Sequence, residues 1–168
     1  NNKNSMILGV VGDTHNRLSN VEKIIDIFNE KNVDKVIHTG DITQAKTLDR
    51  FSRLNCPLIG VYGNNDLEEK GLKDIAKRNG FNFQNPPFFL TISNKKIAIF
   101  HEPEDIENFL KKESSVQLII HGHTHRYRNE KMGDVKIINP GECAGIFKGK
   151  NAVGLINLED LSFERIFF

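Results

Sequence analysis

Residues 6–15 read MILGVVGDTH, a short apolar run that ends in a polar turn with an aspartate and a histidine. The run has the length of a buried strand. Apolar side chains then recur at helical spacing, at Val21, Ile24, Ile25 and Phe28. This spacing predicts an amphipathic helix, and Ser19-x-x-Glu22 predicts its start as a capping box. A strand that leads into a helix is the first unit of an α/β fold.

The alternation of strand and helix continues along the chain. Further strands are predicted at residues 35–38, 57–62, 88–93, 96–100, 117–120, 135–138, 152–157 and 163–167. Further helices are predicted at residues 48–54, 72–78 and 105–112. An Asn94-Lys95 turn joins two of the strands as a hairpin. Because such alternation favours parallel pairing, we expect an α/β architecture of two packed sheets flanked by helices.

Length and composition suit one globular domain, with 168 residues, 38% of them hydrophobic and 27% charged. The stretch from Asn1 to Ser5 is polar and lacks the basic-then-apolar order of a signal peptide. We therefore expect residues 1–5 to be a disordered start or tag remnant and residues 6–168 to form the single domain. No apolar run approaches the ~20 residues that span a bilayer.

Overall charge gives no strong signal for nucleic acid or membranes, because 23 Lys+Arg against 22 Asp+Glu leave a net charge of +1. Local groups of basic residues are interpreted as solvated faces: Lys70, Lys73, Lys77, Arg78, Arg126, Arg128 and Lys131. The two cysteines, Cys56 and Cys143, are too few for a disulfide framework. They indicate a reducing, cytoplasmic location.

Side chains that commonly bind metals follow the predicted strands at five separate places. They are Asp13 and His15, Asp41, Asn64, His101, and His123 with His125. In open α/β sheets, the carboxyl ends of neighbouring parallel strands face a common crevice where ligands bind. Five loops with such side chains at one edge therefore predict a shared metal site rather than core packing.

Residues 122–125, which read GHTH, are the most informative fragment, because two imidazoles on a loop are placed for chelation. The other fragments also have an explanation in turn formation, since aspartate, asparagine and glycine are common in tight turns. His38 and His121 lie in or at the end of apolar runs, so we interpret them as structural histidines. Cys143 follows a turn-like segment, and neither cysteine is needed as a ligand.

Taken in order, the fragments resemble the signature blocks of calcineurin-like metallophosphoesterases. The blocks are Asp13-x-His15, Gly40-Asp41, Gly63-Asn64-Asn65-Asp66, His101 and Gly122-His123-Thr124-His125. The short chain and its NPGE segment at residues 139–142 are most similar to the small archaeal and bacterial phosphodiesterases without a cap domain. This resemblance implies a four-layer αββα sandwich of two mixed sheets and an enzyme that hydrolyses a small phosphodiester substrate.

The same resemblance implies how two metal ions are held. One ion takes Asp13, His15, Asp41 and His125, and the other takes Asp41, Asn64, His101 and His123. Such mixed nitrogen and oxygen ligands suit Mn²⁺, our first choice, or Ni²⁺, Fe²⁺ or Zn²⁺ better than Ca²⁺. Two ions ~3.5–4 Å apart hold a bridging hydroxide that attacks phosphorus, and they neutralise the phosphate oxygens.

Catalytic roles are also implied for Asn65 and Asp66, although the superfamily often has histidine where this chain has Asn65. That histidine is usually assigned to protonate the leaving oxygen, and asparagine is no general acid at neutral pH. We therefore expect a preference for esters whose leaving group departs without a proton, such as aryl phosphates. After His101 the family commonly has a Gly-His pair, whereas this chain has acids in residues 102–104 that would change affinity or selectivity for an anionic substrate.

A protein-binding scaffold is the main alternative function, since the retromer subunit that sorts membrane cargo shares the implied fold. Scaffolds of that kind can lose ligands, whereas all seven candidate positions here hold residues that can coordinate a metal. One structural zinc without activity, or a phosphomonoesterase or nuclease activity at the same site, are further alternatives. The Phe-rich residues 163–168 are predicted to form an exposed strand that could pair two copies as a homodimer.

Overall fold

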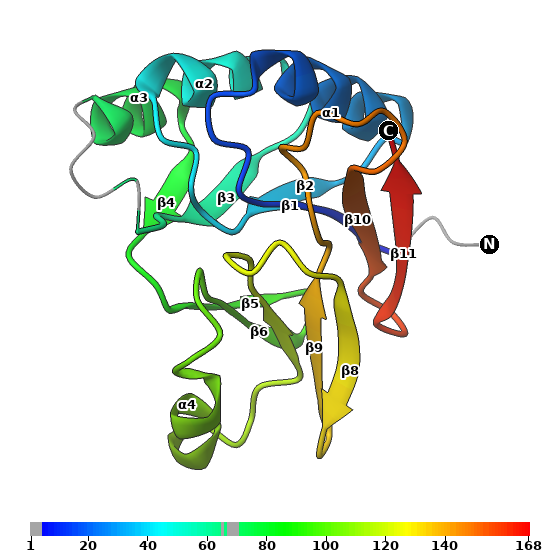
Figure 1. Cartoon of the computed structure of the whole chain (residues 1–168). Coiled ribbons are helices and arrows are strands. Elements are labelled where there is room, and N and C mark those ends of the chain that lie inside the picture. The colour runs from blue at the N-terminus through cyan, green and yellow to red at the C-terminus, as the bar shows by residue number, and fades with distance from the viewer. Residues whose placement is uncertain (1–4, 65, 67–70) are drawn as a thin grey trace.

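Two β-sheets lie between layers of helices in the computed structural model, which describes residues 5–64, 66 and 71–168 (Figure 1). The first sheet has the strand order β11 (Ser162–Phe167), β10 (Ala152–Asn157), β1 (Ile7–Val11), β2 (Lys35–His38), β3 (Leu58–Val61) and β4 (Asn82–Gln84). The second has the order β5 (Phe88–Ile92), β6 (Lys95–Ile99), β7 (Leu118–Ile120), β9 (Val135–Asn139) and β8 (Arg128–Met132). Both contain parallel and antiparallel pairs, so the predicted two mixed sheets are confirmed.

Helices cover the outer faces of both sheets. The first sheet is covered by α1 (Leu18–Glu30), α2 (Ala45–Arg50), a short 3-10 helix (Phe51–Arg53) and α3 (Leu72–Asn79), and α4 (Ile106–Lys112) packs beside the second sheet (Figure 1). The layer order is therefore the αββα order that the resemblance implied. Within the part of the chain that the structure describes, no helix has the length and apolar character needed to cross a membrane.

Central strands are buried on both faces, which explains why their sequences are almost unbroken apolar runs. In β1, Val10 packs in the layer between the two sheets, whereas the next residue, Val11, packs toward the helices. Successive side chains of a strand point to opposite faces, so one strand contributes side chains to two layers of the core. The predicted apolar stripe of α1 is buried against the same sheet, at Val21, Ile24, Ile25 and Phe28.

The predicted capping box does not form. Helix α1 begins at Leu18, one residue before Ser19, and its N-cap position makes no side-chain hydrogen bond. Glu22 instead forms ion pairs with Arg50, the last residue of α2, and Arg53, the last residue of the short 3-10 helix. The ion pairs thus take the carboxylate that the capping box would have used.

Other differences concern turns and edge strands. The hairpin between β5 and β6 turns at Ser93 and Asn94, which both have positive φ, and not at Asn94-Lys95. Two strands were not predicted at all, β4 and β8, whose sequences NFQ and RNEKM lack an apolar alternation. Each is the outermost strand of its sheet, so only one side needs a partner and its faces stay largely exposed.

Candidate metal centre

Parallel strands of both sheets deliver the candidate ligands to one place. Strands β1, β2 and β3 are parallel in the first sheet, and β6, β7 and β9 are parallel in the second. The loops that follow them bring together two groups, Asp13 with His15 and His125, and Asp41 with His101 and His123. Within each group the potential ligand atoms all lie within 4.8 Å of one another. Each group combines both sheets, so the site lies across the seam between them.

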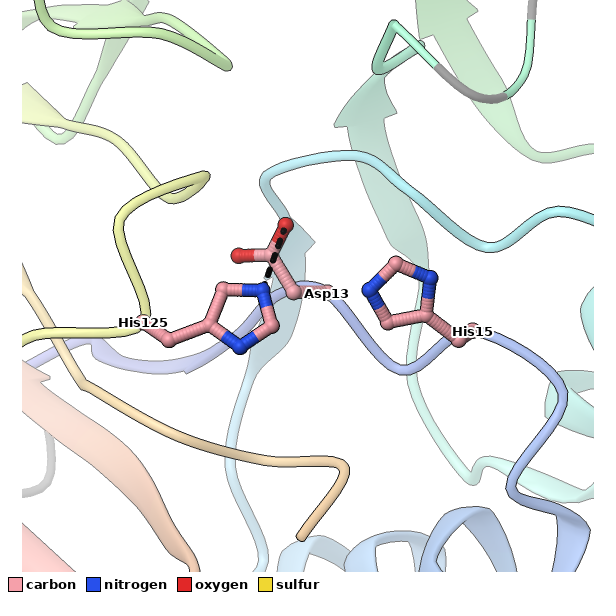
Figure 2. Close-up of side chains that lie close together, drawn as sticks. All are labelled: Asp13, His15 and His125. Atoms are coloured by element: carbon pink, nitrogen blue, oxygen red, sulfur yellow. Dashed lines mark ion pairs between the residues drawn. The ribbon is translucent and has the colours of Figure 1, made fainter.

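The first group surrounds Asp13, which is only 1% exposed. Figure 2 shows its carboxylate beside the imidazole ring of His125, with the ring of His15 on the other side of Asp13, and the two ring centroids are 5.7 Å apart. Asp13 Oδ2 accepts a hydrogen bond from the backbone N–H of His123 at 2.8 Å, and Oδ1 lies 3.7 Å from His125 Nε2. Although buried, Oδ1 has no hydrogen-bond partner among the described residues. A buried, unpartnered carboxylate oxygen beside two imidazoles fits a bound cation.

The second group surrounds the Nε2 atom of His101. Asp41 Oδ2 lies 3.4 Å from this atom, and His123 Nδ1 lies 3.3 Å from it. The side-chain amide of Asn64 directs one terminal atom to His101 Nε2 at 2.8 Å, and that atom also lies 3.2 and 3.3 Å from the two carboxylate oxygens of Asp41. Four potential ligands therefore converge on one small volume. In the orientation that satisfies its partners, the Asn64 amide nitrogen faces inward and donates to Asp41 and His101, whereas a bound cation would require the amide oxygen at this place.

Outer partners fix the tautomers of two histidines. His101 Nδ1 lies 2.8 Å from the carbonyl oxygen of Thr39, which only accepts, so this nitrogen carries the hydrogen. His125 Nδ1 donates in the same way to Glu142 Oε2 at 3.0 Å. In the neutral rings both Nε2 atoms therefore present lone pairs to the site, as in histidines that bind metals.

Electrostatics also favour a cation. Burial alone would lower the pKa of His101, but the hydrogen bond and the charge of Asp41 raise this pKa to about 9. Burial raises the pKa of Asp13, and the charges of His101 and His125 partly offset that rise. The raised pKa of His101 means that this buried site holds a proton strongly and therefore attracts positive charge. A metal ion would compete with that proton for the same lone pairs.

Backbone strain is concentrated at the candidate ligands. Positive φ angles occur at Asp13 (51°), His15 (47°), Asp41 (62°), His123 (70°) and His125 (60°). These five make up half of the ten non-glycine residues with positive φ that the described chain contains, although they are a small fraction of its length. Since such conformations are uncommon and cluster at functional sites, this concentration supports a shared functional role for the three loops that carry these residues.

Two glycines make room for the carboxylates. A Cβ atom at Gly122 would lie 2.8 Å from Asp13 Oδ2, and one at Gly63 would overlap Asp41 Oδ1. Any larger residue would push these carboxylates away from the histidines. This close approach explains why glycine precedes both Asn64 and His123 in the sequence.

Asp66, which was predicted to be catalytic, is 3% exposed and binds backbone. Its carboxylate accepts hydrogen bonds of 2.7 to 2.9 Å from the N–H groups of Asp41, Ile42, Thr43 and Gly63. Burial raises the pKa of Asp66, and these donors offset part of the rise. The contacts tie the loop of Asp41 to the loop of Asn64. Asn65, the other predicted catalytic residue, lies outside the described residues, and both catalytic roles stay predictions.

His38 and His121 are buried outside both groups, which confirms their interpretation as structural histidines. His38 accepts a hydrogen bond from Gly40 N–H at Nδ1 and contacts Thr14 Oγ1 through Nε2, both at 3.0 Å. His121 Nε2 accepts from Arg128 at 3.1 Å, so this arginine is not simply solvated as predicted. Burial lowers the pKa of His38 to about 3 and that of His121 to about 4.

Cys143 is fully buried, and its thiol hydrogen-bonds the carbonyl oxygen of Ala152 at 3.1 Å. Burial raises its pKa to about 12, so it is not a thiolate and takes no part in either group. Two contributors to the site were missed. Glu142 follows β9 as the ligands follow their strands, and the same criterion would have found it. Thr39 acts through its backbone carbonyl, which no side-chain pattern reveals.

The chain belongs to the calcineurin-like phosphoesterase superfamily, since the family model described as "Calcineurin-like phosphoesterase superfamily domain" matches residues 6–161. Phosphodiesterase MJ0936 of Methanocaldococcus jannaschii is 36% identical to it over 163 residues, which cover 96% of this chain and 98% of that protein. The predicted family and the predicted enzyme class, a phosphoesterase, are thereby confirmed.

Solved structures show the same fold. The structure of a novel archaeal phosphodiesterase superposes with a TM-score of 0.87 at 34% identity, covering 97% of this chain and 100% of that one. Vps29 of Entamoeba histolytica, solved in complex with Zn²⁺, superposes with a TM-score of 0.65 at 22% identity, covering 96% of this chain and 99% of that one. The second likeness shows a shared fold alone.

Proposed function

We propose that this chain is a phosphodiesterase that uses two divalent metal ions. One ion would be held by Asp13, His15, Asp41 and His125, and the other by Asp41, Asn64, His101 and His123. Asp41 would be shared between them. The mixture of imidazole, carboxylate and amide ligands suits Mn²⁺ best, with Ni²⁺, Fe²⁺ and Zn²⁺ as alternatives.

The main observation behind the proposal is that, in each group, an imidazole Nε2 atom and a carboxylate oxygen face one another. In the first, His125 Nε2 faces Asp13 Oδ1 at 3.7 Å, and in the second, His101 Nε2 faces Asp41 Oδ2 at 3.4 Å. Ligands bound about 2.0–2.2 Å from one ion are themselves about 3–3.5 Å apart, which is close to both distances. A cation in each group would take the place of a proton between these atoms and turn the contacts into coordination.

When bound, two such ions supply a hydroxide nucleophile at neutral pH and neutralise charge on the phosphate oxygens. The protein itself contributes orientation. Thr39 and Glu142 hold two imidazoles in the tautomer that presents Nε2, and Asp66 holds the loop that carries Asp41. Asn65 in place of a histidine leaves no general acid at that position, so we propose that aryl esters, whose leaving groups need no proton, are hydrolysed fastest.

A phosphodiester is favoured over a phosphomonoester for two reasons. Phosphodiesterase MJ0936 carries that activity in its name and spans nearly the same length. In addition, Glu102 places its carboxylate 3.9 Å from His123 Nε2, beside the second group. A monoester carries one more negative charge than a diester, so this carboxylate repels it more strongly.

The test is hydrolysis of bis(4-nitrophenyl) phosphate with Mn²⁺, Ni²⁺, Fe²⁺ or Zn²⁺ added one at a time, repeated with Asp41→Asn. We expect turnover with Mn²⁺ and a loss of at least about 100-fold in the variant, because both ions would lose a charged ligand. Asp134→Asn, at an exposed position in the turn before β9, is the matched control and keeps full activity.

Metal analysis separates the remaining functions. Two ions per chain with turnover of the diester support the proposal. One tightly held zinc without hydrolysis would instead favour a structural site, and bound metal with no turnover of any ester would favour a protein-binding scaffold. Faster turnover of 4-nitrophenyl phosphate than of the diester would favour a phosphomonoesterase, and cleavage of DNA or RNA alone a nuclease.

We also propose a reducing cytoplasm as the compartment, since both cysteines are free thiols. A homodimer through β11 is a further proposal, because among the described residues β11 is the outermost strand of the first sheet and has a neighbouring strand on one edge alone. Light scattering over a range of concentrations tests it. Concentration dependence that disappears when residues 163–168 are removed supports pairing through this strand, and a monomer at all concentrations contradicts it.

A further inference from the structure

A pocket of about 400 Å³ lies beside the second ligand group. We propose that it binds an uncharged aromatic ester group of the substrate, an inference that rests on the proposed function and narrows the substrate class. Pockets for small ligands typically have volumes of about 300–1,000 Å³, so this one has room for a single ring and its substituents.

The pocket adjoins the proposed reaction centre through two of its lining residues, His101 and Glu102. His101 Nε2 lies 3.4 Å from Asp41 Oδ2, and Glu102 Oε2 lies 3.9 Å from His123 Nε2. A phosphate bound at the second group would therefore have one of its ester groups at the entrance of the pocket.

One wall of the pocket is a face of helix α4 with the residue before it. The contributing residues are spaced by three, four and seven positions, as side chains on one helical face are: Asp105, Asn108, Phe109 and Lys112. Phe109 packs edge-on against Phe100 with ring centroids 5.2 Å apart, and both rings line the pocket. Pro86 and Pro87 add further apolar surface from the loop before β5. Flat apolar surfaces of this kind suit a flat apolar ring.

Charge at the pocket argues against a second phosphate as its occupant. Among the lining residues that the structure describes, Glu102 and Asp105 bring two carboxylates and Lys112 one ammonium group. With His101 neutral as a metal ligand, as the proposed function requires, these three side chains carry one net negative charge, which repels an anionic substituent and leaves an uncharged ring unaffected. The substrate class is therefore a phosphodiester with an uncharged aromatic group on one ester oxygen.

The experiment compares two inhibitors that cannot be hydrolysed and carry one substituent each, phenylphosphonate and methylphosphonate. Their inhibition constants are measured against bis(4-nitrophenyl) phosphate in the wild type and in Asn108→Trp, which fills the pocket from an exposed position. Asn129→Trp, at an exposed position on strand β8 outside the pocket lining, is the matched control. Calorimetric titration of both phosphonates into the metal-loaded protein measures the same affinities without turnover.

We expect phenylphosphonate to bind the wild type and Asn129→Trp at least about tenfold more tightly than methylphosphonate, because a buried ring adds apolar contact. In Asn108→Trp the ratio falls to about one. Equal affinities in the wild type, or an unchanged ratio in a folded Asn108→Trp, overturn the inference. Lys112→Trp gives the same comparison if Asn108→Trp does not fold. Absence of turnover by the wild type with every metal overturns the proposed function instead, and the calorimetric ratio then still decides the pocket.

Discussion

Glu142 Oε2 lies 3.0 Å from His125 Nδ1, and this contact fixes which nitrogen of the imidazole faces Asp13. We predict that Glu142→Met weakens Mn²⁺ binding by about 10- to 100-fold, as loss of an outer hydrogen bond to a histidine ligand typically does. Glu142→Gln, which keeps an acceptor, loses less. Titration calorimetry measures both, with Glu164→Met at an exposed position on β11 as the control. Unchanged affinity in Glu142→Met would contradict a positioning role.

Asp66 accepts hydrogen bonds only from backbone N–H groups in the contacts described, which predicts a stability effect. In Asp66→Asn, the new amide nitrogen faces donors, so buried N–H groups lose their acceptor at a cost of about 1–3 kcal/mol. For a chain of this size the melting temperature then falls by about 2–4 °C per kcal/mol. Differential scanning calorimetry of the metal-free protein measures the fall, and Asp134→Asn is expected to melt like the wild type. Equal melting of all three proteins contradicts the prediction.

His38 predicts a defined pH dependence of stability. Gly40 N–H points at Nδ1, and burial lowers the pKa of His38 to about 3, whereas an unfolded histidine titrates near its ordinary pKa of about 6.5. Between these values the unfolded state binds one more proton here, so the free energy of unfolding falls as the pH falls.

His38→Asn keeps an acceptor near the position of Nδ1 but removes the titration. We expect the free energy of unfolding, measured with urea on the metal-free protein from about pH 6 to about pH 5, to fall less steeply in the variant by up to about 1.4 kcal/mol per pH unit. His121 titrates in both proteins and cancels in the comparison. Parallel slopes in variant and wild type would mean that His38 is protonated in the folded protein.

Asn65 predicts a dependence on the leaving group. Restoring an imidazole in Asn65→His is expected to raise turnover of dialkyl phosphates by about 10²–10⁴-fold, the usual contribution of a general acid, and to change turnover of bis(4-nitrophenyl) phosphate little. Steady-state kinetics on both esters with Mn²⁺ gives the comparison. Equal turnover of alkyl and aryl diesters by the wild type would remove the basis for this prediction.

The sequence predicted the parts of the fold that hydrophobic periodicity governs. Strand β2 and strand β10 have the predicted bounds, because their apolar runs are buried on both faces and end at polar turns. Strand β8 could not be predicted in this way, since a polar edge strand is held by backbone hydrogen bonds to β9 and not by side-chain burial. The start of α1 was also beyond prediction from local sequence, since ion pairs with arginines far along the chain decide the orientation of Glu22.

For the site, the criterion of polar residues after strand ends collected the six histidines and aspartates of the two groups. These side chains come together because the topology brings the carboxyl ends of parallel strands from both sheets to one place. What it could not reveal are contacts through the backbone. The carbonyl of Thr39 and the N–H groups bound by Asp66 depend on loop conformation, including positive φ angles that the side-chain pattern does not encode.

Each ligand group joins loops of both sheets, Asp13 to His125 and Asp41 to His101. An ion held there would cross-link the loops of the two sheets and stabilise their packing at this end, in addition to any role in hydrolysis. Chelation with EDTA is then expected to speed amide hydrogen exchange at the ends of β1 and β7 while leaving the turn between β8 and β9, at residues 133–134, unchanged. In a cell that lacks the metal, the protein would then lose stability at this end of the two sheets as well as activity.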